Sequence, residues 1–132
     1  MAAADFFRGV FETAVGPHEL VTEVRVPKQS GDHVWSYLKF RRRAQDWATV
    51  GVAAVARRSN GGVEEAAISL VSMGATPLRA AASEAAWNAG DDPGPVAAEG
   101  TEPPSDTNGS ADYRRHLVQV LVRRAVEEAE AR

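Results

Sequence analysis

The sequence has no cysteine among its 132 residues. This absence excludes disulfide bonds, thiolate nucleophiles and cysteine ligands for zinc or iron–sulfur clusters within the chain. The sequence also lacks the run of about 18 apolar residues that a membrane-spanning helix needs, so no membrane insertion is expected. Its first residues have neither the basic start nor the apolar core of a signal peptide. We therefore expect a cytoplasmic protein.

A strong net charge is also missing. The 15 basic and 18 acidic residues give a formal net charge of -3. Such a balance provides no general attraction to nucleic acid, and no nucleic-acid partner is predicted. The arginines instead form local clusters, at positions 41–43, 57–58, 114–115 and 123–124.

Common catalytic signatures are absent as well. The sequence contains no phosphate-binding G-x-x-x-x-G-K-[ST] loop, no dinucleotide-binding G-x-G-x-x-G and no G-x-S-x-G nucleophile elbow. Its three histidines, His18, His33 and His116, lie far apart and form no i, i+4 pair. Catalytic residues and metal ligands are therefore not predicted in this chain.

Alternation of apolar and polar residues predicts a β-sheet. The strand-like segments are residues 20–26, 34–41, 47–57 and 63–73. Residues 6–11 form a short aromatic stretch, expected as an edge strand or as an arm that packs on a neighbour. Asn60–Gly61, between two strand-like runs, is a strong signal for a tight hairpin. These features predict an antiparallel sheet of three or four strands.

The pattern changes from strands to helices after Gly74. The alanine-rich residues 80–89 predict a helix that ends at Gly90. Residues 91–107 are rich in Pro, Gly, Asp and Glu, which indicates either a mobile loop or the remnant of a second helix near residues 96–99.

The last segment predicts an amphipathic helix that packs on the sheet. Ser110 is its candidate N-cap, and we expect Tyr113 and Arg114 to tie it to the sheet or to a neighbouring subunit. Strands followed by helices indicate an α+β fold, with the antiparallel sheet covered by helices on one face. Residues 1–132 are expected to form a single domain.

The stretch Lys39–Val50 is the most unusual part of the sequence. It places four positive charges within five residues, immediately before an apolar strand. On the preceding strand, Trp35, Tyr37, Lys39 and Arg41 share one face, and aromatic side chains in such a row cover a partner more naturally than they face water. The simpler interpretation is a solvated basic turn that leads into a core strand. The residues alone leave both open.

Several segments, in order along the chain, together resemble one known family. They are Asp5–Thr13 with Glu19–Pro27, Tyr37–Val50, Gly74–Ala80 and Gly109–Leu117. They resemble the C-terminal domain of the FAD-binding subunit of molybdenum hydroxylases, the family of aerobic carbon monoxide dehydrogenase and xanthine dehydrogenase. The Asp-Trp-Ala-Thr sequence at residues 46–49 is particularly similar to the carbon monoxide dehydrogenase medium subunit. The resemblance covers nearly the whole chain.

The resemblance implies a role in electron transfer through FAD. In the family, electrons pass from a molybdopterin subunit through two iron–sulfur clusters to FAD, and this domain closes one side of the flavin site. The two FAD-binding lobes, with their pyrophosphate loops, are absent from this sequence. We therefore expect the chain alone to be catalytically silent and to bind FAD weakly or not at all.

Partners follow from the same resemblance. They are the FAD-binding lobes, the iron–sulfur subunit and the molybdopterin subunit of one enzyme. The alternative is a stand-alone interaction domain, in which the face of Trp35, Tyr37, Lys39 and Arg41 forms a homodimer or docks a separate FAD subunit.

The resemblance also implies cofactor-facing positions, at Lys39, Arg43, Asp46 and Trp47. Lys39 matches a basic position near the flavin, where a cation would stabilise the anionic reduced form; the alternative is a solvated lysine beside Tyr37. Arg43 and Asp46 are candidates for an ion pair that shapes the turn, or each only caps the loop. Trp47 could touch the cofactor or a partner, although burial in the core is the more common place for tryptophan.

Overall fold

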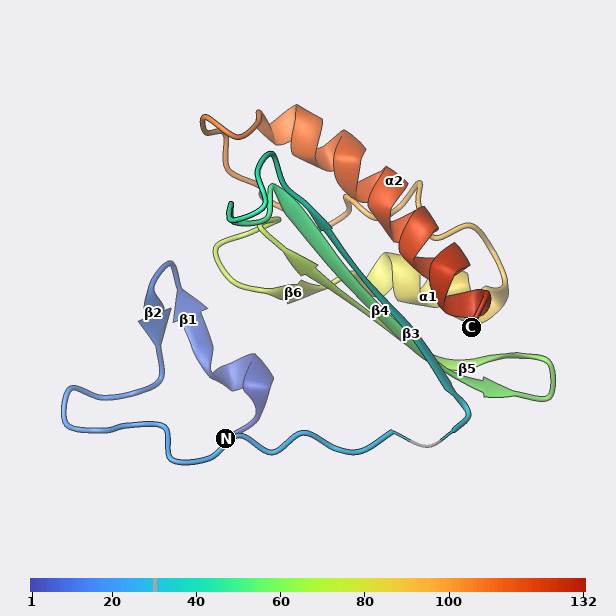
Figure 1. The fold of residues 1–132 in the computed structure, drawn as a ribbon, viewed down its shortest axis with the longest axis horizontal. Helices are drawn as coiled ribbons and strands as arrows, with labels where there is room; N and C mark the ends of the chain where they lie inside the picture. Colours follow the sequence, from blue (N-terminus) through green and yellow to red (C-terminus); the bar gives the residue numbers. More distant parts are fainter. Residues whose placement is uncertain (30) are drawn as a thin grey trace.

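The computed structural model describes residues 1–29 and 31–132. Its main part is a four-stranded antiparallel sheet in the order β3-β4-β5-β6. The strands are β3 (His33–Phe40), β4 (Val50–Ser59), β5 (Gly62–Val71) and β6 (Leu78–Arg79). Two helices, α1 (Ala81–Ala89) and α2 (Ala111–Glu130), lie on one face of this sheet (Figure 1). The predicted α+β fold is confirmed.

Neighbouring strands in the sheet are also neighbours in the sequence. The turn between β4 and β5 has positive φ angles at Asn60 (51°) and Gly61 (82°). Two such angles are what a type I′ hairpin turn requires, which is why the Asn-Gly pair predicted the hairpin correctly. At the other end, Phe40 pairs with Val50, so residues 41–49 form the connection from β3 to β4.

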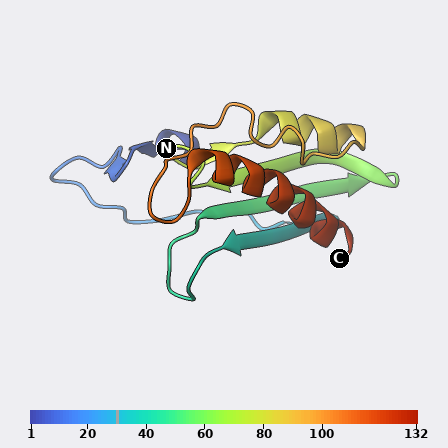
Figure 2. The same ribbon diagram turned by 90° about the horizontal axis from the view of Figure 1, so that it is seen from above.

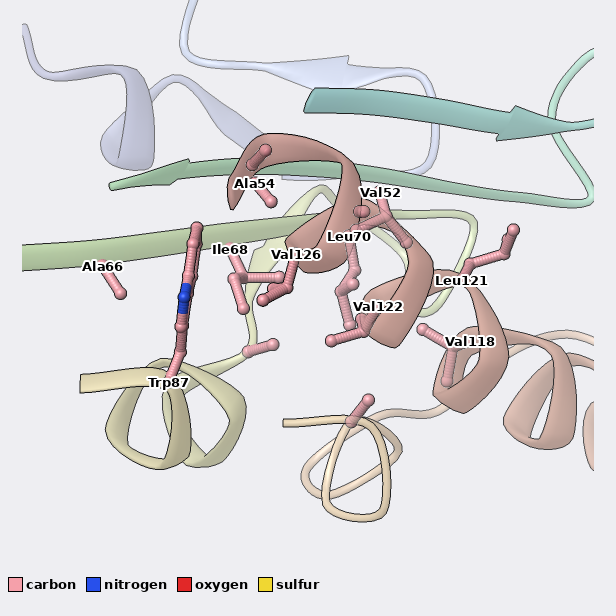
Figure 3. Packing of buried hydrophobic residues seen from close by; sticks show 14 of the residues in the cluster. Val52, Ala54, Ala66, Ile68, Leu70, Trp87, Val118, Leu121, Val122 and Val126 are labelled. Carbon is pink, nitrogen blue, oxygen red and sulfur yellow. The ribbon is translucent and has the colours of Figure 1, made fainter. Parts of the chain in front are cut away.

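The core lies between the sheet and the helices. It is built from alternate residues of β4 and β5 and from one face of α2 (Figure 3). Trp87 of α1 is buried among them, and its ring reaches toward Ala66 and Ile68 of β5. The largest fully buried aliphatic side chains are Val50, Val52, Ile68, Leu70, Val118 and Val122.

Both helix boundaries follow their local signals. Gly90 ends α1 in the left-handed conformation, with φ of 80°, which glycine adopts without a steric penalty. The Ser110 hydroxyl accepts a hydrogen bond from the N–H of Tyr113 at 3.2 Å and caps α2. The predicted helix end and N-cap are both confirmed.

The strand predicted at residues 20–26 is wrong. The structure gives this segment no strand assignment, and its side chains are exposed on both faces. The alternating pattern is present, but within the described chain the segment has no neighbouring strand to complete a ladder. Residues 6–11 also lie outside the main sheet: they contribute to a small hairpin of β1 (Phe7–Gly9) and β2 (Glu12–Thr13) after a 3-10 turn, η1 (Ala3–Asp5). In Figure 1 this hairpin lies away from both helices.

Two further boundaries differ from the sequence prediction. β4 begins at Val50 and not at Trp47, because residues 41–49 are needed to turn the chain between two strands in register. Leu78–Arg79, which lies outside the predicted strands, forms the short strand β6 by pairing with Ser69 and Leu70. The sheet thus has four strands.

The segment 91–107 forms a packed connection between the helices. Figure 2 shows the connection from α1 to α2 running along the same side of the sheet as the helices themselves. Pro93 accepts a hydrogen bond from Ser83 at 2.9 Å, and the N–H of Glu102 donates to Met73 at 2.9 Å. Its turns do not make a helix. The mobility expected for residues 91–107 stays a prediction. The hydrogen bonds of Ser83 and Glu102 would limit such motion.

Across the residues that the structure describes, no helix is both long and apolar enough to span a bilayer.

Candidate cofactor-facing edge of the sheet

The basic loop, residues 41–49, lies at the end of the sheet where β3 turns into β4. Arg41, Arg42 and Arg43 are all exposed. Where the loop returns to the sheet, the N–H of Thr49 donates to the carbonyl of Phe40 at 2.8 Å and closes it. The loop therefore presents concentrated positive charge on a short, closed connection.

Arg43 and Asp46 form a backbone turn. The Asp46 carboxylate accepts a hydrogen bond from the backbone N–H of Arg43 at 3.1 Å, and the N–H of Asp46 donates to the Arg43 carbonyl at 3.1 Å. Asp46 thus caps the loop, which was the alternative to an ion pair. Arg43, at the start of this turn, is exposed.

Trp47 is not a core residue, contrary to its expected burial. It is 78% exposed. Its ring meets Phe11 edge-to-face, with 6.2 Å between the centroids. Two residues, Ala48 and Thr49, separate Trp47 from the start of β4, so the indole belongs to the loop and not to the strand.

Lys39 is half-buried near the end of β3, on the face of the sheet opposite the helices. It pairs with Gly51, which pairs in turn with Val71. A methyl group added at Gly51 would lie 3.2 Å from Cβ of Val71 and 3.6 Å from the hydroxyl of Tyr37. Glycine therefore lets Tyr37 and Val71 approach each other beside Lys39. The predicted common face is confirmed for Trp35, Tyr37 and Lys39, whereas Arg41, predicted on the same face, lies beyond the end of β3 in the basic loop.

The buried side chain of Arg114 holds the end of the basic loop in place. Its side chain is 2% exposed and donates to the carbonyl of Thr49 and, at 2.7 Å, to the carboxylate of Asp106. We call these three residues the Arg114 anchor. Because Thr49 ends the basic loop and Arg114 belongs to α2, the anchor joins the loop directly to the helix. The expectation that Arg114 ties the last helix to the sheet is confirmed.

Two further contacts and one close approach at a glycine hold the same region. Arg42 donates to the carbonyl of Thr107 at 3.1 Å. The Tyr113 ring meets Phe40, the last residue of β3, edge-to-face with 6.5 Å between centroids. A methyl group at Gly109 would come within 2.9 Å of that tyrosine ring, so a larger residue there would displace it. The loop, the end of β3 and the start of α2 therefore form one connected unit.

Asp106 is the carboxylate of this unit, and hydrogen bonds hold its pKa below the ordinary value. The largest cause is the backbone N–H of Asn108, followed by the Arg114 side chain. A carboxylate with a lowered folded-state pKa stabilises the fold above its unfolded pKa, and this contribution is lost as the pH falls through the folded value.

We expect Asp106→Asn to lower the thermal midpoint at pH 7 by about 2–5 °C. The difference from the unsubstituted chain should shrink below about pH 4, where the unfolded aspartate is protonated. Thermal melts followed by circular dichroism between pH 2 and pH 8 measure this. Asp5→Asn, in the exposed N-terminal segment, is the control. A difference that stays constant over the whole pH range would contradict the role of the ionised carboxylate.

The basic loop and Trp47 lie open to solvent. Two hollows, of about 290 and 630 Å³, lie at the opposite end of the sheet near Arg58. Over the described residues, no group of three or more His, Asp or Glu side chains could hold a metal ion. The exposed cations and indole therefore form an open edge, which needs a second surface to enclose a ligand.

Sequence reasoning missed two parts of this edge. The carbonyl groups of Thr49 and Thr107 are used by arginines 65 positions away in the sequence, and no local pattern shows such pairs. One signal was available: Arg114 lies one turn before Leu117 and Val118 on the apolar face of α2, where an arginine needs a buried partner.

A protein-family model matches most of the chain. The CO dehydrogenase flavoprotein C-terminal domain matches residues 35–129, which is more than half of the chain.

Individual relatives extend the similarity to the whole chain. The carbon monoxide dehydrogenase medium chain of Afipia carboxidovorans is 37% identical over 139 residues, covering 100% of this chain and 48% of that protein. The xanthine dehydrogenase FAD-binding subunit of Escherichia coli O157:H7 is 28% identical and covers 96% and 46%. Reconstituted CO dehydrogenase from Oligotropha carboxidovorans superimposes with a TM-score of 0.91 at 36% identity, covering 100% of this chain and 49% of that one. The chain thus spans about half the length of the curated relatives it matches.

Proposed function

The chain belongs to the CO dehydrogenase flavoprotein C-terminal domain family, and on this premise we propose that it closes one side of an FAD site in a molybdenum hydroxylase. The flavin itself would be held mainly by the half of the subunit that this chain does not span. The assembly would pass electrons to FAD from an iron–sulfur subunit and a molybdopterin subunit. This function is carried by one observation above all: the basic loop and Trp47 lie exposed on a connection that is firmly tied to the fold.

The side chains at this end of the sheet are suited to contact one side of a flavin. Cations near the isoalloxazine favour its anionic reduced form, and Lys39 and Arg43 are the proposed contacts. Trp47 presents an exposed ring that could stack on or shield the cofactor, and Asp46 holds the turn from which Arg43 extends. When bound, FAD would supply the electron-accepting chemistry. This sequence contains no glycine-rich pyrophosphate loop. The pyrophosphate of FAD would therefore be bound by the other half of the subunit.

The parent enzyme's substrate lies outside this proposal. The matched relatives are named for carbon monoxide in one case and for xanthine in another. A domain shared by both is not the part that selects between such different molecules. We also propose that the assembly lies in the cytoplasm, the default for a chain without a signal peptide-like start.

A second candidate function rests on the exposed aromatic face of β3. Trp35 and Tyr37 are exposed, and β3 is an edge strand of the sheet. A homodimer through this face would make the chain a stand-alone interaction domain. Sizing chromatography of the chain distinguishes the two proposals. A monomer supports its role as a domain of the FAD subunit. A stable dimer that Tyr37→Glu dissociates supports a stand-alone interaction domain.

The proposed function is tested with a chimaera. The part of the Afipia carboxidovorans medium chain that this chain does not cover would be joined to residue 1. The chimaera is expected to retain FAD on purification, with a flavin absorbance spectrum, whereas the chain alone should not bind FAD tightly. Tight binding of FAD by the chain alone, or a folded chimaera that binds none, would contradict the proposal.

Lys39 should raise the flavin potential. We expect Lys39→Met in the chimaera to lower the midpoint potential of bound FAD, because loss of the cation removes stabilisation of the anionic reduced flavin. Redox titration followed by flavin absorbance measures it. Lys28→Met removes the only other lysine, and it should leave the potential unchanged. An unaltered potential in Lys39→Met would show that Lys39 is only a solvated side chain.

A further inference from the structure

Residues 20–26, which we call the unpaired segment, are exposed and belong to neither sheet of the described chain. Leu20, Val24 and Val26 are 75%, 77% and 80% exposed. Within the described residues, its backbone N–H and C=O groups have no backbone partners. Exposed apolar side chains on an unpaired, β-branched stretch are what sheet pairing normally covers.

The two faces of the unpaired segment differ in chemistry. Alternation puts Leu20, Val24 and Val26 on one side of an extended chain, together with Thr22. The other side carries Glu23 and Arg25, whose side chains pair at 2.5 Å, along with Val21. One apolar and one charged face is the pattern of a strand in an antiparallel sheet that is covered on one side only. The segment thus has the chemistry of a sheet strand without a sheet.

The comparisons indicate where that sheet belongs. The family match begins at residue 35, so the unpaired segment precedes the matched domain. Alignment with the Afipia medium chain nevertheless includes all of this chain, and that protein is about twice as long. That relative therefore carries an equivalent of this segment, together with a further half that the present chain does not span.

We propose that residues 20–26 form a strand of an antiparallel sheet in the flavin-binding half, with Leu20, Val24 and Val26 facing that half's core. The inference rests on the proposed function, because it takes the flavin-binding half as the partner. Main-chain hydrogen bonds to an existing sheet edge supply the affinity, and alternate side chains supply the register. The strand thereby joins the two halves of the subunit.

A second copy of the chain is a weaker occupant on physical grounds. Two unpaired segments from two copies would make a two-stranded ribbon, which is marginally stable in water without a third strand or a packed face. A preformed sheet provides both. The Glu23–Arg25 pair on the outer face remains in water in the same arrangement.

Hydrogen exchange tests the pairing directly. Amides of residues 20–26 would be compared between this chain alone and the Afipia chimaera described above, by exchange and mass spectrometry. We expect free exchange in the chain alone and slowing by about 100-fold in the chimaera. The flavin absorbance of the same chimaera sample reports the proposed function independently.

A pair of neighbouring substitutions tests which face is buried. Val24→Asp places a charge on the apolar face and should reduce the protection of residues 20–26 in the chimaera by at least about tenfold. Arg25→Gln, one residue along on the charged face, should change it little. In the chain alone, neither substitution should alter the thermal midpoint, because both side chains are exposed.

The outcomes separate the two proposals. If the chimaera binds FAD while the amides of residues 20–26 exchange freely, the proposed strand pairing is wrong and the proposed function stands. Protection without flavin binding overturns the function and leaves the strand. A chimaera that fails to fold where the Afipia medium chain folds overturns both. Concentration-dependent protection in the chain alone identifies a second copy as the partner and overturns this inference.

Discussion

Replacing Arg114 with methionine is expected to lower the free energy of unfolding by about 2–4 kcal/mol. Methionine keeps much of the apolar stem but removes the guanidinium, so the buried carbonyl of Thr49 loses its donor. Asp106 loses its charged partner as well, although it is partly exposed and water can replace some of that interaction. Urea unfolding followed by far-ultraviolet circular dichroism measures the change.

The adjacent arginine provides a matched control. Arg115 pairs with Asp112 at 2.9 Å on the surface of the same helix turn. Such exposed pairs contribute about 0–1 kcal/mol, so Arg115→Met should change stability little. Equal losses in both variants would show that arginine at this end of α2 acts through general charge and not through the Arg114 anchor.

Replacing Trp87 with alanine is expected to cost about 3–5 kcal/mol, the largest effect of any single change considered for the core. Trp87 is 2% exposed and its ring packs against β5. Its indole N–H donates to the Glu130 carboxylate at 2.8 Å, which joins α1 to the end of α2. A domain of this size is stabilised by roughly 5–15 kcal/mol, so the loss is a large fraction of the total.

The same substitution at Trp47 is the control. Trp47 is exposed, and its ring contacts that of Phe11, which is itself exposed. Trp47→Ala should change the unfolding free energy of the chain by less than about 0.5 kcal/mol. Trp87→Phe separates packing from hydrogen bonding and should retain more than half of the stability lost in Trp87→Ala. A larger loss at Trp47 than at Trp87 would contradict the core described above.

Most of the fold follows from short-range patterns. Alternation in residues 34–41 and 63–73, the Asn60–Gly61 turn and the Ser110 cap each depend on a few neighbouring residues, and each is confirmed. Failure came at residues 20–26, where the pattern of a strand is present but the partner strand is not. Strand formation needs hydrogen bonds to a second segment, which no window of sequence contains.

The candidate edge was predicted in part. The cluster of basic residues and its position before an apolar strand are visible in the sequence, and the structure places that cluster in an exposed loop. Trp47 was expected in the core because tryptophan is usually buried, but the register of β3 and β4 leaves it in the connection. Its proposed contact with FAD, like those of Lys39, Arg43 and Asp46, stays a prediction.

The sequence by itself determined the family, the strands β3 to β5 and both helices, because these depend on residue type and spacing. Only the tertiary structure decided how the basic loop is held. Arg114 meets Thr49 and Arg42 meets Thr107 across 65 residues of chain, and such pairs exist only after the sheet and α2 have packed. The structure also decided that residues 20–26 remain unpaired, since a strand is defined by its partner as much as by its own residues.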